Sequence, residues 1–188
     1  MNNTLIFLRH AETKKEENIP VSKWVLTEEG KQKSEDLVKT GIFDDVDIII
    51  SSKEVKAYQT AKPFAKKLNK RIIQIKELSE LNRDKGKTMT KEYYDKMKVK
   101  IFEDLDYTDF GWETSNHALN RFKKAVQKID KKYENKKILI VAHGTVMTLY
   151  FAFLQNKLND LFSRWKGLDF CGYGIVKNNK VVKDIGQK

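Results

Sequence analysis

Two of the three histidines in the chain stand directly after short apolar runs. His10 follows a run of four apolar residues and is preceded by Arg9, whereas His143 follows the run 138–142. If both runs are buried strands of one parallel sheet, their carboxyl ends meet at the edge where such sheets hold their active sites. A single histidine in this place is more often a structural hydrogen bonder. Two of them, with one of only five arginines beside the first, favour a functional site.

These residue types suit the transfer of a phosphoryl group. A guanidinium group offers a planar fork of donors that matches two phosphate oxygens, and neutral imidazole is a competent nucleophile near pH 7. The transition state spreads negative charge over the non-bridging oxygens, so fixed cations are the main stabilising device. The leaving oxygen must also gain a proton. An acid within reach of the histidines is therefore expected.

Short apolar runs alternate with longer amphipathic stretches along the chain. Six runs are predicted as strands, the last two forming a hairpin that turns at Asn178 and Asn179; they are 4–8, 47–50, 72–75, 138–142, 173–176 and 181–185. Continuous apolar strands separated by helices are typical of a mainly parallel sheet with helices on both faces. The predicted fold is therefore an α/β three-layer sandwich, formed by residues 1–188 as a single domain.

Helices are expected between these strands. Thr27 offers an N-cap for the first helix, Ser51 and Glu54 have capping-box spacing for the second, and Pro63 should interrupt that second helix. Further helices are predicted over about 90–103, 114–134 and 145–154. The segment around 83–112 is polar and carries few strand signals, so we expect a surface excursion there that caps the substrate.

The composition excludes several classes of protein. The single cysteine, Cys171, cannot form an intramolecular disulfide, and the first apolar run is too short for a signal peptide or a membrane span. The net charge of +11 comes mainly from lysines spread over every helical segment, which indicates a solvated surface rather than a nucleic-acid stripe. We expect a cytoplasmic protein with no membrane and no nucleic acid as partner.

Five short motifs, taken in order, resemble those of the histidine phosphatase superfamily in its phosphoglycerate mutase-like branch. They are RHAET at 9–13, LTEEGKQ at 26–32, SSKEVKAYQTA at 51–61, LSE at 78–80 and VAHG at 141–144. Each fragment alone is weak, but their order and the predicted architecture agree. The resemblance implies a phosphoglycerate mutase-like fold and no metal or cofactor.

The resemblance also implies a role for each residue. His10 would attack phosphorus and become a phosphohistidine, while Arg9 and His143 would hold the phosphoryl oxygens, the latter as a cation. Thr13 would add a hydrogen bond to the phosphate. Glu80 would protonate the leaving oxygen and later activate water, and burial is expected to raise the pKa of this carboxyl group.

Two further residues of the motifs are placed at the substrate, and three positions depart from the family pattern, one of them Glu16, where the family often has asparagine. Lys56 and Gly144 are expected to bind substrate. Lys56 stands where the family usually has arginine, so it keeps the charge but loses the bidentate fork. Ala11 stands where the family usually has glycine, which is tolerable if its backbone angles are ordinary.

Three functions remain open for the sequence. The first is a phosphomonoesterase acting on a small phosphorylated metabolite, and the second is a phosphoglycerate mutase, which in this family goes with a longer insertion after the acid. The third is a non-catalytic module that binds phosphate or nucleic acid on the same fold. The presence of both histidines and an acid favours an enzyme.

Substrate specificity is assigned to the excursion, which carries no readable signature. Arg83, Lys85 and Lys87 could meet an anionic leaving group, but a solvated loop is the simpler interpretation. Trp24, Trp112 and Trp165 are interpreted as packing residues, and Glu113 as an ordinary acid before a helix. The oligomeric state has no signal in the sequence.

Overall fold

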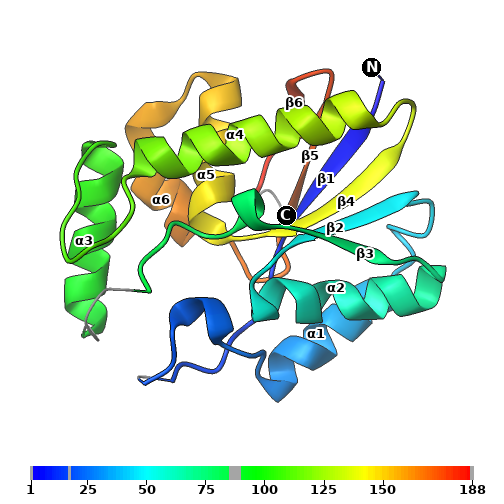
Figure 1. Cartoon of the computed structure of the whole chain (residues 1–188), viewed down its shortest axis with the longest axis horizontal. Helices are drawn as coiled ribbons and strands as arrows, with labels where there is room; N and C mark the ends of the chain where they lie inside the picture. Colours follow the sequence, from blue (N-terminus) through cyan, green and yellow to red (C-terminus); the bar gives the residue numbers. More distant parts are fainter. Residues whose placement is uncertain (1, 17, 85–89, 187–188) are drawn as a thin grey trace.

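The centre of the computed structural model is a six-stranded sheet with the order β3-β2-β4-β1-β5-β6 (Figure 1). The structure describes residues 2–16, 18–84 and 90–186. The strands are β1 Thr4–Arg9, β2 Ile48–Ser52, β3 Ile72–Ile75, β4 Lys137–Ala142, β5 Tyr173–Lys177 and β6 Lys180–Lys183. The first four pair in parallel, and β5 and β6 continue the sheet in antiparallel pairing. The predicted mainly parallel sheet is confirmed.

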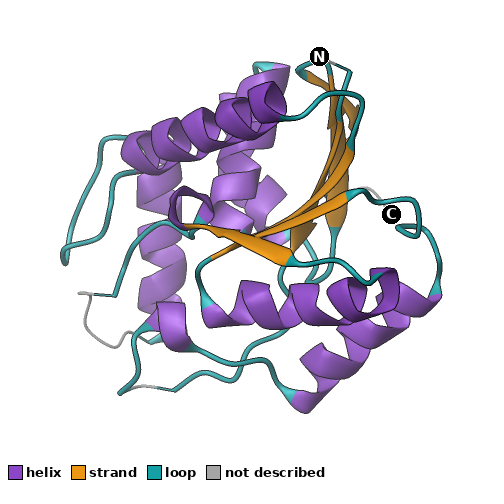
Figure 2. Cartoon of the chain, turned by 45° about the vertical axis from the view of Figure 1, so that its right-hand side comes forward, coloured by secondary structure: helices purple, strands orange, loops and turns teal. Residues whose placement is uncertain are grey.

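Helices cover both faces of this sheet (Figure 2). They are α1 Glu28–Lys39, α2 Val55–Leu68, α3 Lys91–Glu103, α4 Ser115–Lys132, α5 Gly144–Gln155 and α6 Leu161–Lys166, with short 3-10 turns η1 Val21–Lys23, η2 Lys76–Leu78 and η3 Leu158–Asp160. The helices α1 and α2 lie on one face, and α4, α5 and α6 lie on the other, which is the predicted three-layer sandwich. Among the described residues, the helices are too short or too polar to cross a membrane.

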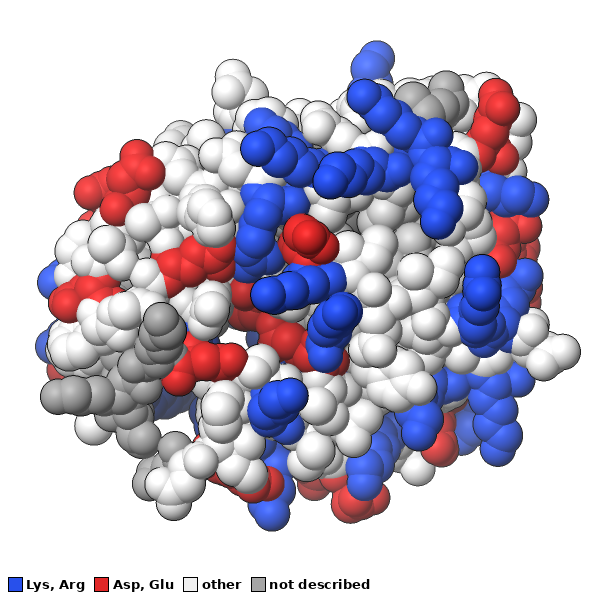
Figure 3. Space-filling view, viewed as in Figure 1, with Lys and Arg blue, Asp and Glu red and all other residues white. Residues whose placement is uncertain are grey.

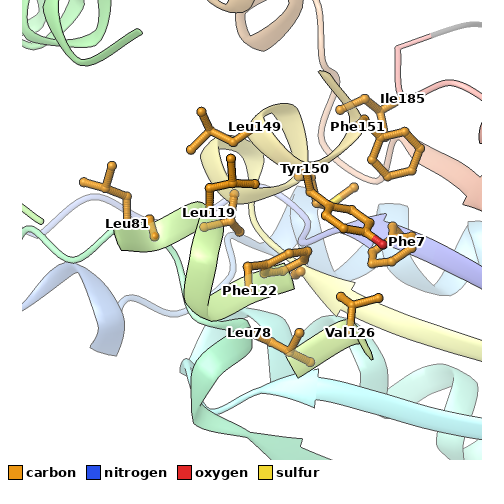
Figure 4. Close-up of a cluster of buried hydrophobic side chains, with 14 of the residues drawn as sticks. Phe7, Leu78, Leu81, Leu119, Phe122, Val126, Leu149, Tyr150, Phe151 and Ile185 are labelled. Atoms are coloured by element: carbon orange, nitrogen blue, oxygen red, sulfur yellow. The ribbon is translucent and has the colours of Figure 1, made fainter. Parts of the chain in front are cut away.

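The alternation of side chains along the central strands divides the core in two. Along β1, Leu5 and Phe7 enter the cluster beneath α4 and α5, whereas Ile6 and Leu8 enter the cluster beneath α1 and α2. This period of two is the geometry of a strand buried on both faces, and it explains why the run is apolar throughout. Figure 4 shows Phe7 beside aromatic and aliphatic residues of the first cluster.

Two local predictions about α2 are wrong. Ser51 lies inside β2 and donates its hydroxyl to the Ser52 carbonyl at 2.9 Å, so it does not cap the helix. Pro63 lies inside α2 without ending it. Ala61 and Phe64 on either side of the proline are buried in the core, and their burial outweighs the hydrogen bond that a proline cannot donate.

The helix predicted within the excursion forms as α3, but it is not purely a surface element. Met97 and Ile101 are buried in the core cluster, and Phe102 and Tyr94 lie against Trp165 of α6 with ring centroids 6.3 and 6.0 Å apart. The excursion therefore packs against α6, close to the edge of the sheet where the parallel strands end.

Candidate active site

His10 is the first residue after β1, and its ring is oriented by the backbone. The backbone N–H of His10 donates to the Ala142 carbonyl at 2.9 Å, and the ring Nδ1 lies 2.7 Å from the Ala11 carbonyl oxygen. Because a carbonyl oxygen only accepts, Nδ1 carries the hydrogen and Nε2 keeps an unshared electron pair. Burial lowers the pKa of His10 well below its usual value, and the charges of Lys56 and Arg9 lower it further. The imidazole is therefore neutral at pH 7, as a nucleophile requires.

His143 follows β4 and faces His10, with the two ring centroids 5.1 Å apart. Its Nε2 lies 2.7 Å from the Ser52 hydroxyl, which itself accepts the N–H of Glu54, so the hydroxyl hydrogen is available to Nε2. This arrangement places the ring hydrogen on Nδ1, a buried atom with no partner among the described residues. Burial lowers the pKa of His143, and Lys56 adds to this effect. The expectation of a cationic His143 is therefore wrong for this state: it offers a neutral donor.

Arg9 forms the wall beside His10. Its Nη1 donates to the Leu168 carbonyl, its guanidinium carbon lies 4.2 Å from the centre of the Phe170 ring, and its buried Nε has no partner among the described residues. A Cβ atom on Gly144 would lie 3.3 Å from that Nε and 3.4 Å from Nε1 of Trp165. Glycine at 144 thus gives the guanidinium room at the start of α5.

Glu80 is half-buried and sits at the amino end of α5. Its carboxylate accepts the N–H groups of Thr145 at 3.0 Å and Val146 at 3.2 Å, and that of Leu81 at 2.9 Å. Burial acts to raise the pKa of Glu80, but the charge of Lys98 and these N–H donors outweigh it and hold the pKa well below its usual range. The expected raised pKa is therefore wrong for the structure without substrate, in which Glu80 is ionised.

Lys56 is buried and engaged with protein groups. Its ammonium pairs with the carboxylate of Glu54 and donates to the Val21 carbonyl at 2.7 Å. The other oxygen of Glu54 accepts the N–H of Glu80 at 2.6 Å. Lys56 thus stabilises the segment that carries Glu80. These partners use two of the three hydrogens of its ammonium, which leaves one for a ligand in the cavity that Lys56 lines.

One cavity of about 750 Å³ opens over these groups. Five of the seven predicted site residues line it, namely Arg9, His10, Thr13, Lys56 and Glu80. His143 and Gly144 lie directly behind His10 and Arg9. Aromatic side chains form much of the remaining wall, and they are Trp24, Tyr94, Trp112, Trp165 and Phe170. The three tryptophans are therefore not only packing residues.

The surface around the cavity carries charge of both signs. Lysine and arginine side chains are spread over the face shown in Figure 3, with aspartate and glutamate between many of them. This distribution matches a solvated surface. Within the described part of the chain, no group of three or more histidine, cysteine or acidic residues is placed to hold a metal ion.

Several site residues escaped the sequence analysis. Ser52 stands at the carboxyl end of β2, so the same rule that selected the histidines could have found it. Lys98, Arg121 and Phe170 gave no signal. Lys98 is one of many lysines, although it is buried, and its Nζ donates to the Thr145 hydroxyl at 2.6 Å.

Comparisons with known proteins identify the family and the fold of the chain. The sequence model of the histidine phosphatase superfamily (branch 1) matches residues 5–180. The chain is 26% identical over 195 residues to phosphoserine phosphatase 1 of Hydrogenobacter thermophilus, covering 95% of this chain and 90% of that protein.

Two solved structures share the fold at low identity. A mycobacterial glucosyl-3-phosphoglycerate phosphatase superposes with a TM-score of 0.79 at 15% identity, over 100% of both chains. A mutant of phosphoserine phosphatase from Entamoeba histolytica, in complex with phosphoserine, superposes with a TM-score of 0.76 at 21% identity, over 96% of this chain and 94% of the other.

Proposed function

Since the chain belongs to the histidine phosphatase superfamily (branch 1) and is a phosphatase, we propose that it hydrolyses small phosphomonoesters through a phosphohistidine at His10. The observation that carries this proposal is the state of the His10 ring. Its Nδ1 is bonded to a backbone carbonyl, so the neutral Nε2 is left as the attacking atom.

The first half of the reaction forms a bond between Nε2 of His10 and phosphorus and breaks the bond from phosphorus to the leaving oxygen. In this proposal the guanidinium of Arg9 and the Nδ1–H of His143 stabilise the charge on the phosphoryl oxygens; the support is that the rings of His10 and His143 face each other and that Nε of Arg9 and Nδ1 of His143 are buried without a partner among the described residues. The leaving oxygen takes its proton from Glu80. The second half reverses the order: Glu80 takes a proton from water, and the water oxygen displaces His10.

Glu80 is ionised before substrate arrives, so its proton must come with the substrate. A phosphomonoester loses its second proton near pH 6, and a fraction therefore binds as the monoanion. A phosphate placed next to Glu80 also raises the pKa of this carboxyl group by like-charge repulsion. The ionised state is already the one needed to activate water in the second half.

The proposal is tested by trapping the intermediate. We expect rapid denaturing quench of the enzyme with labelled phosphoserine, the substrate named for two relatives, to leave label on His10. His10→Ala should lose the label and lower kcat by about a thousandfold or more, because no nucleophile remains. The matched control is His117→Ala, since His117 is exposed and outside the cavity; its ring contacts Glu113 at 2.5 Å, so this variant should keep its label on His10 and lose at most a small part of its kcat.

Label on another residue, or full turnover by His10→Ala, would overturn the nucleophile assignment. Product analysis separates the two enzyme classes, because a phosphatase releases inorganic phosphate, whereas a mutase returns the phosphoryl group to an organic acceptor.

A further inference from the structure

Arg83 stands three residues after Glu80 and is enclosed by aromatic rings. Its guanidinium carbon lies 4.7 Å from the ring centre of Tyr94, 5.7 Å from that of Trp24 and 5.8 Å from that of Trp112. We call these three rings the aromatic collar. Cation–π attraction to rings on three sides holds the guanidinium in place and displaces water from it.

No acid in the described part of the chain pairs with Arg83. Among the described residues it forms no hydrogen bond or ion pair, and its Nε is buried without a partner. The neighbouring Asp84 is engaged elsewhere, accepting the N–H of Ser22 at 3.1 Å and the Ser22 hydroxyl at 2.5 Å. A half-buried cation without a counter-charge is costly, so its place on the cavity wall points to an anion that arrives with a ligand.

Lys98 provides an internal comparison. It is also surrounded by rings, including those of Tyr94 and Trp112, but its Nζ donates to the Thr145 hydroxyl and it does not line the cavity. The cation that faces the cavity is the one left without a polar partner.

On the basis of the proposed function, we propose that Arg83 binds a second oxyanion, a carboxylate or a further phosphate, on the leaving-group half of the substrate. The substrate would then be held at both ends, by Arg9 and His10 at the reacting phosphate and by Arg83 at the other anion. A guanidinium fork binds either oxyanion with two parallel hydrogen bonds. Phosphorylated amino or hydroxy acids, and sugar bisphosphates, have this form.

The test compares pairs of substrates that differ in the second anion. Phosphoserine is paired with phosphoethanolamine, which lacks only the carboxylate, and fructose bisphosphate is paired with fructose monophosphate. In Arg83→Met, kcat/KM for the doubly anionic member of the preferred pair should fall by about 10- to 100-fold, the loss of a charge-assisted hydrogen-bond pair. The singly anionic member should change less than about threefold. The pair that responds identifies the oxyanion as carboxylate or phosphate.

Two variants control for charge and for packing. Lys96→Met removes one charge from α3 at an exposed residue paired with Glu92, and it should affect both members of each pair equally and weakly. Arg83→Lys keeps the charge without the fork and should recover part of the selective loss. An equal loss on both members of both pairs would assign Arg83 to the packing of the aromatic collar and overturn the proposal.

Binding measurements keep this inference separate from the reaction mechanism. In His10→Ala, binding of phosphoserine and phosphoethanolamine is followed by tryptophan fluorescence, because Trp24 and Trp112 lie in the aromatic collar. The Arg83 proposal predicts tighter binding of the doubly anionic member, and loss of this preference in the double variant with Arg83→Met. If the two ligands bind equally well, the Arg83 proposal is overturned, even if the wild-type enzyme forms the phosphohistidine. If the binding preference is present but the wild-type enzyme shows no turnover, only the proposed function is overturned.

Discussion

The two imidazoles of the site are hydrogen-bonded to the protein through different ring nitrogens, so each has a different nitrogen left for a ligand. The Nδ1 atom of His10 is hydrogen-bonded to a backbone carbonyl, which leaves Nε2 for the proposed attack on phosphorus. The Nε2 atom of His143 is hydrogen-bonded to Ser52, which leaves its Nδ1–H as a donor. Burial lowers the pKa of both. A pair of neutral rings can therefore lie 5.1 Å apart without charge repulsion until the phosphate arrives.

The role of Glu80 is tested by the leaving group. In Glu80→Gln, we expect kcat/KM for phosphoserine to fall by about 100-fold or more, because its alkoxide leaves poorly without a proton. An activated aryl phosphate, which leaves as a stable anion, should lose less than about tenfold. The measurement is a comparison of steady-state rates for both substrates, and equal losses on the two would mean that the acid is another group.

Individual residues of the site were predictable where a strand end or a motif marked them. Arg9, His10, Glu80 and His143 were found in this way, and the structure brings them together. Ser52 binds His143 across 91 positions of the chain, so their spacing carries no information. The pKa of Glu80 was misjudged because burial was considered without the N–H groups of α5, which become neighbours only in the folded chain.

At the scale of elements, the segment that carries Glu80 is fixed from two sides. Leu78 and Leu81 are buried in the core, which anchors the segment on both sides of the acid. Arg121 of α4 then donates to three carbonyls of the segment, those of Glu77 at 2.9 Å, Ser79 at 2.7 Å and Glu80 at 2.7 Å. Glu113 holds the same guanidinium with both carboxylate oxygens, at 2.7 and 2.8 Å.

Breaking this clamp should displace Glu80, the proposed acid, while leaving His10, the proposed nucleophile, in position. We expect Arg121→Met to lower kcat for phosphoserine by about 10- to 100-fold with a smaller effect on an activated aryl phosphate, since small displacements of a catalytic group cost that much. Glu113→Gln should act in the same direction but less. The measurement is steady-state kcat for both substrates, and circular dichroism verifies that each variant is folded.

The chain offers a matched control for the lost ion pair. Asp184→Asn breaks an ion pair in which both carboxylate oxygens of Asp184 accept from Arg164. The two acids are similarly buried: the side chain of Asp184 is 13% exposed and that of Glu113 is 9% exposed. Asp184 does not touch the segment 77–82. If this variant lowered kcat as much as Glu113→Gln, the effect would be one of general stability and not of positioning.

Elements with strong local signals were predictable, and those made by tertiary contact were not. Thr27 caps α1 as expected, accepting the N–H of Gly30 at 2.9 Å, and Asn178 and Asn179 adopt the positive φ angles of 51° and 59° that the hairpin turn requires. The short helix α6 escaped, because it is stabilised by packing against α3 and α5. The capping-box spacing of Ser51 and Glu54 misled because Ser51 lies inside β2, which ends at Ser52.

At the scale of the whole molecule, the buried ammonium of Lys98 joins α3 to α5, which packs on the sheet. Lys98 reaches from α3 to the Thr145 hydroxyl at the start of α5, and the N–H of Thr145 in turn binds Glu80. The rings of Trp165, Tyr94, Trp112 and Phe102 surround the ammonium at 5.2 to 5.8 Å. Burial lowers the pKa of Lys98 to about 7, and Glu80 opposes the shift.

This charge makes stability depend on pH in an unusual range. Between pH 7 and pH 10 the unfolded chain keeps the Lys98 proton that the folded chain loses, so stability rises with pH there. The lowered pKa values of His10 and His143 make stability rise with pH below about 6.5 for the same reason. Burial raises the pKa of Cys171 and Tyr94, so their contributions to stability fall with pH above about pH 8.5 and pH 10 respectively, and they oppose the rise from Lys98 there.

We therefore expect the free energy of unfolding to increase by roughly 2 kcal/mol from pH 7 to pH 8.5, and Lys98→Met to abolish this increase while keeping the one below pH 6.5. Urea unfolding at pH 5.5, 7 and 8.5 measures both windows in each protein. Lys96→Met, an exposed lysine on the same helix, is the control and should follow the wild type. A rise above pH 7 that persists in Lys98→Met would show that another group carries it, because methionine fills the aromatic enclosure without a proton to lose.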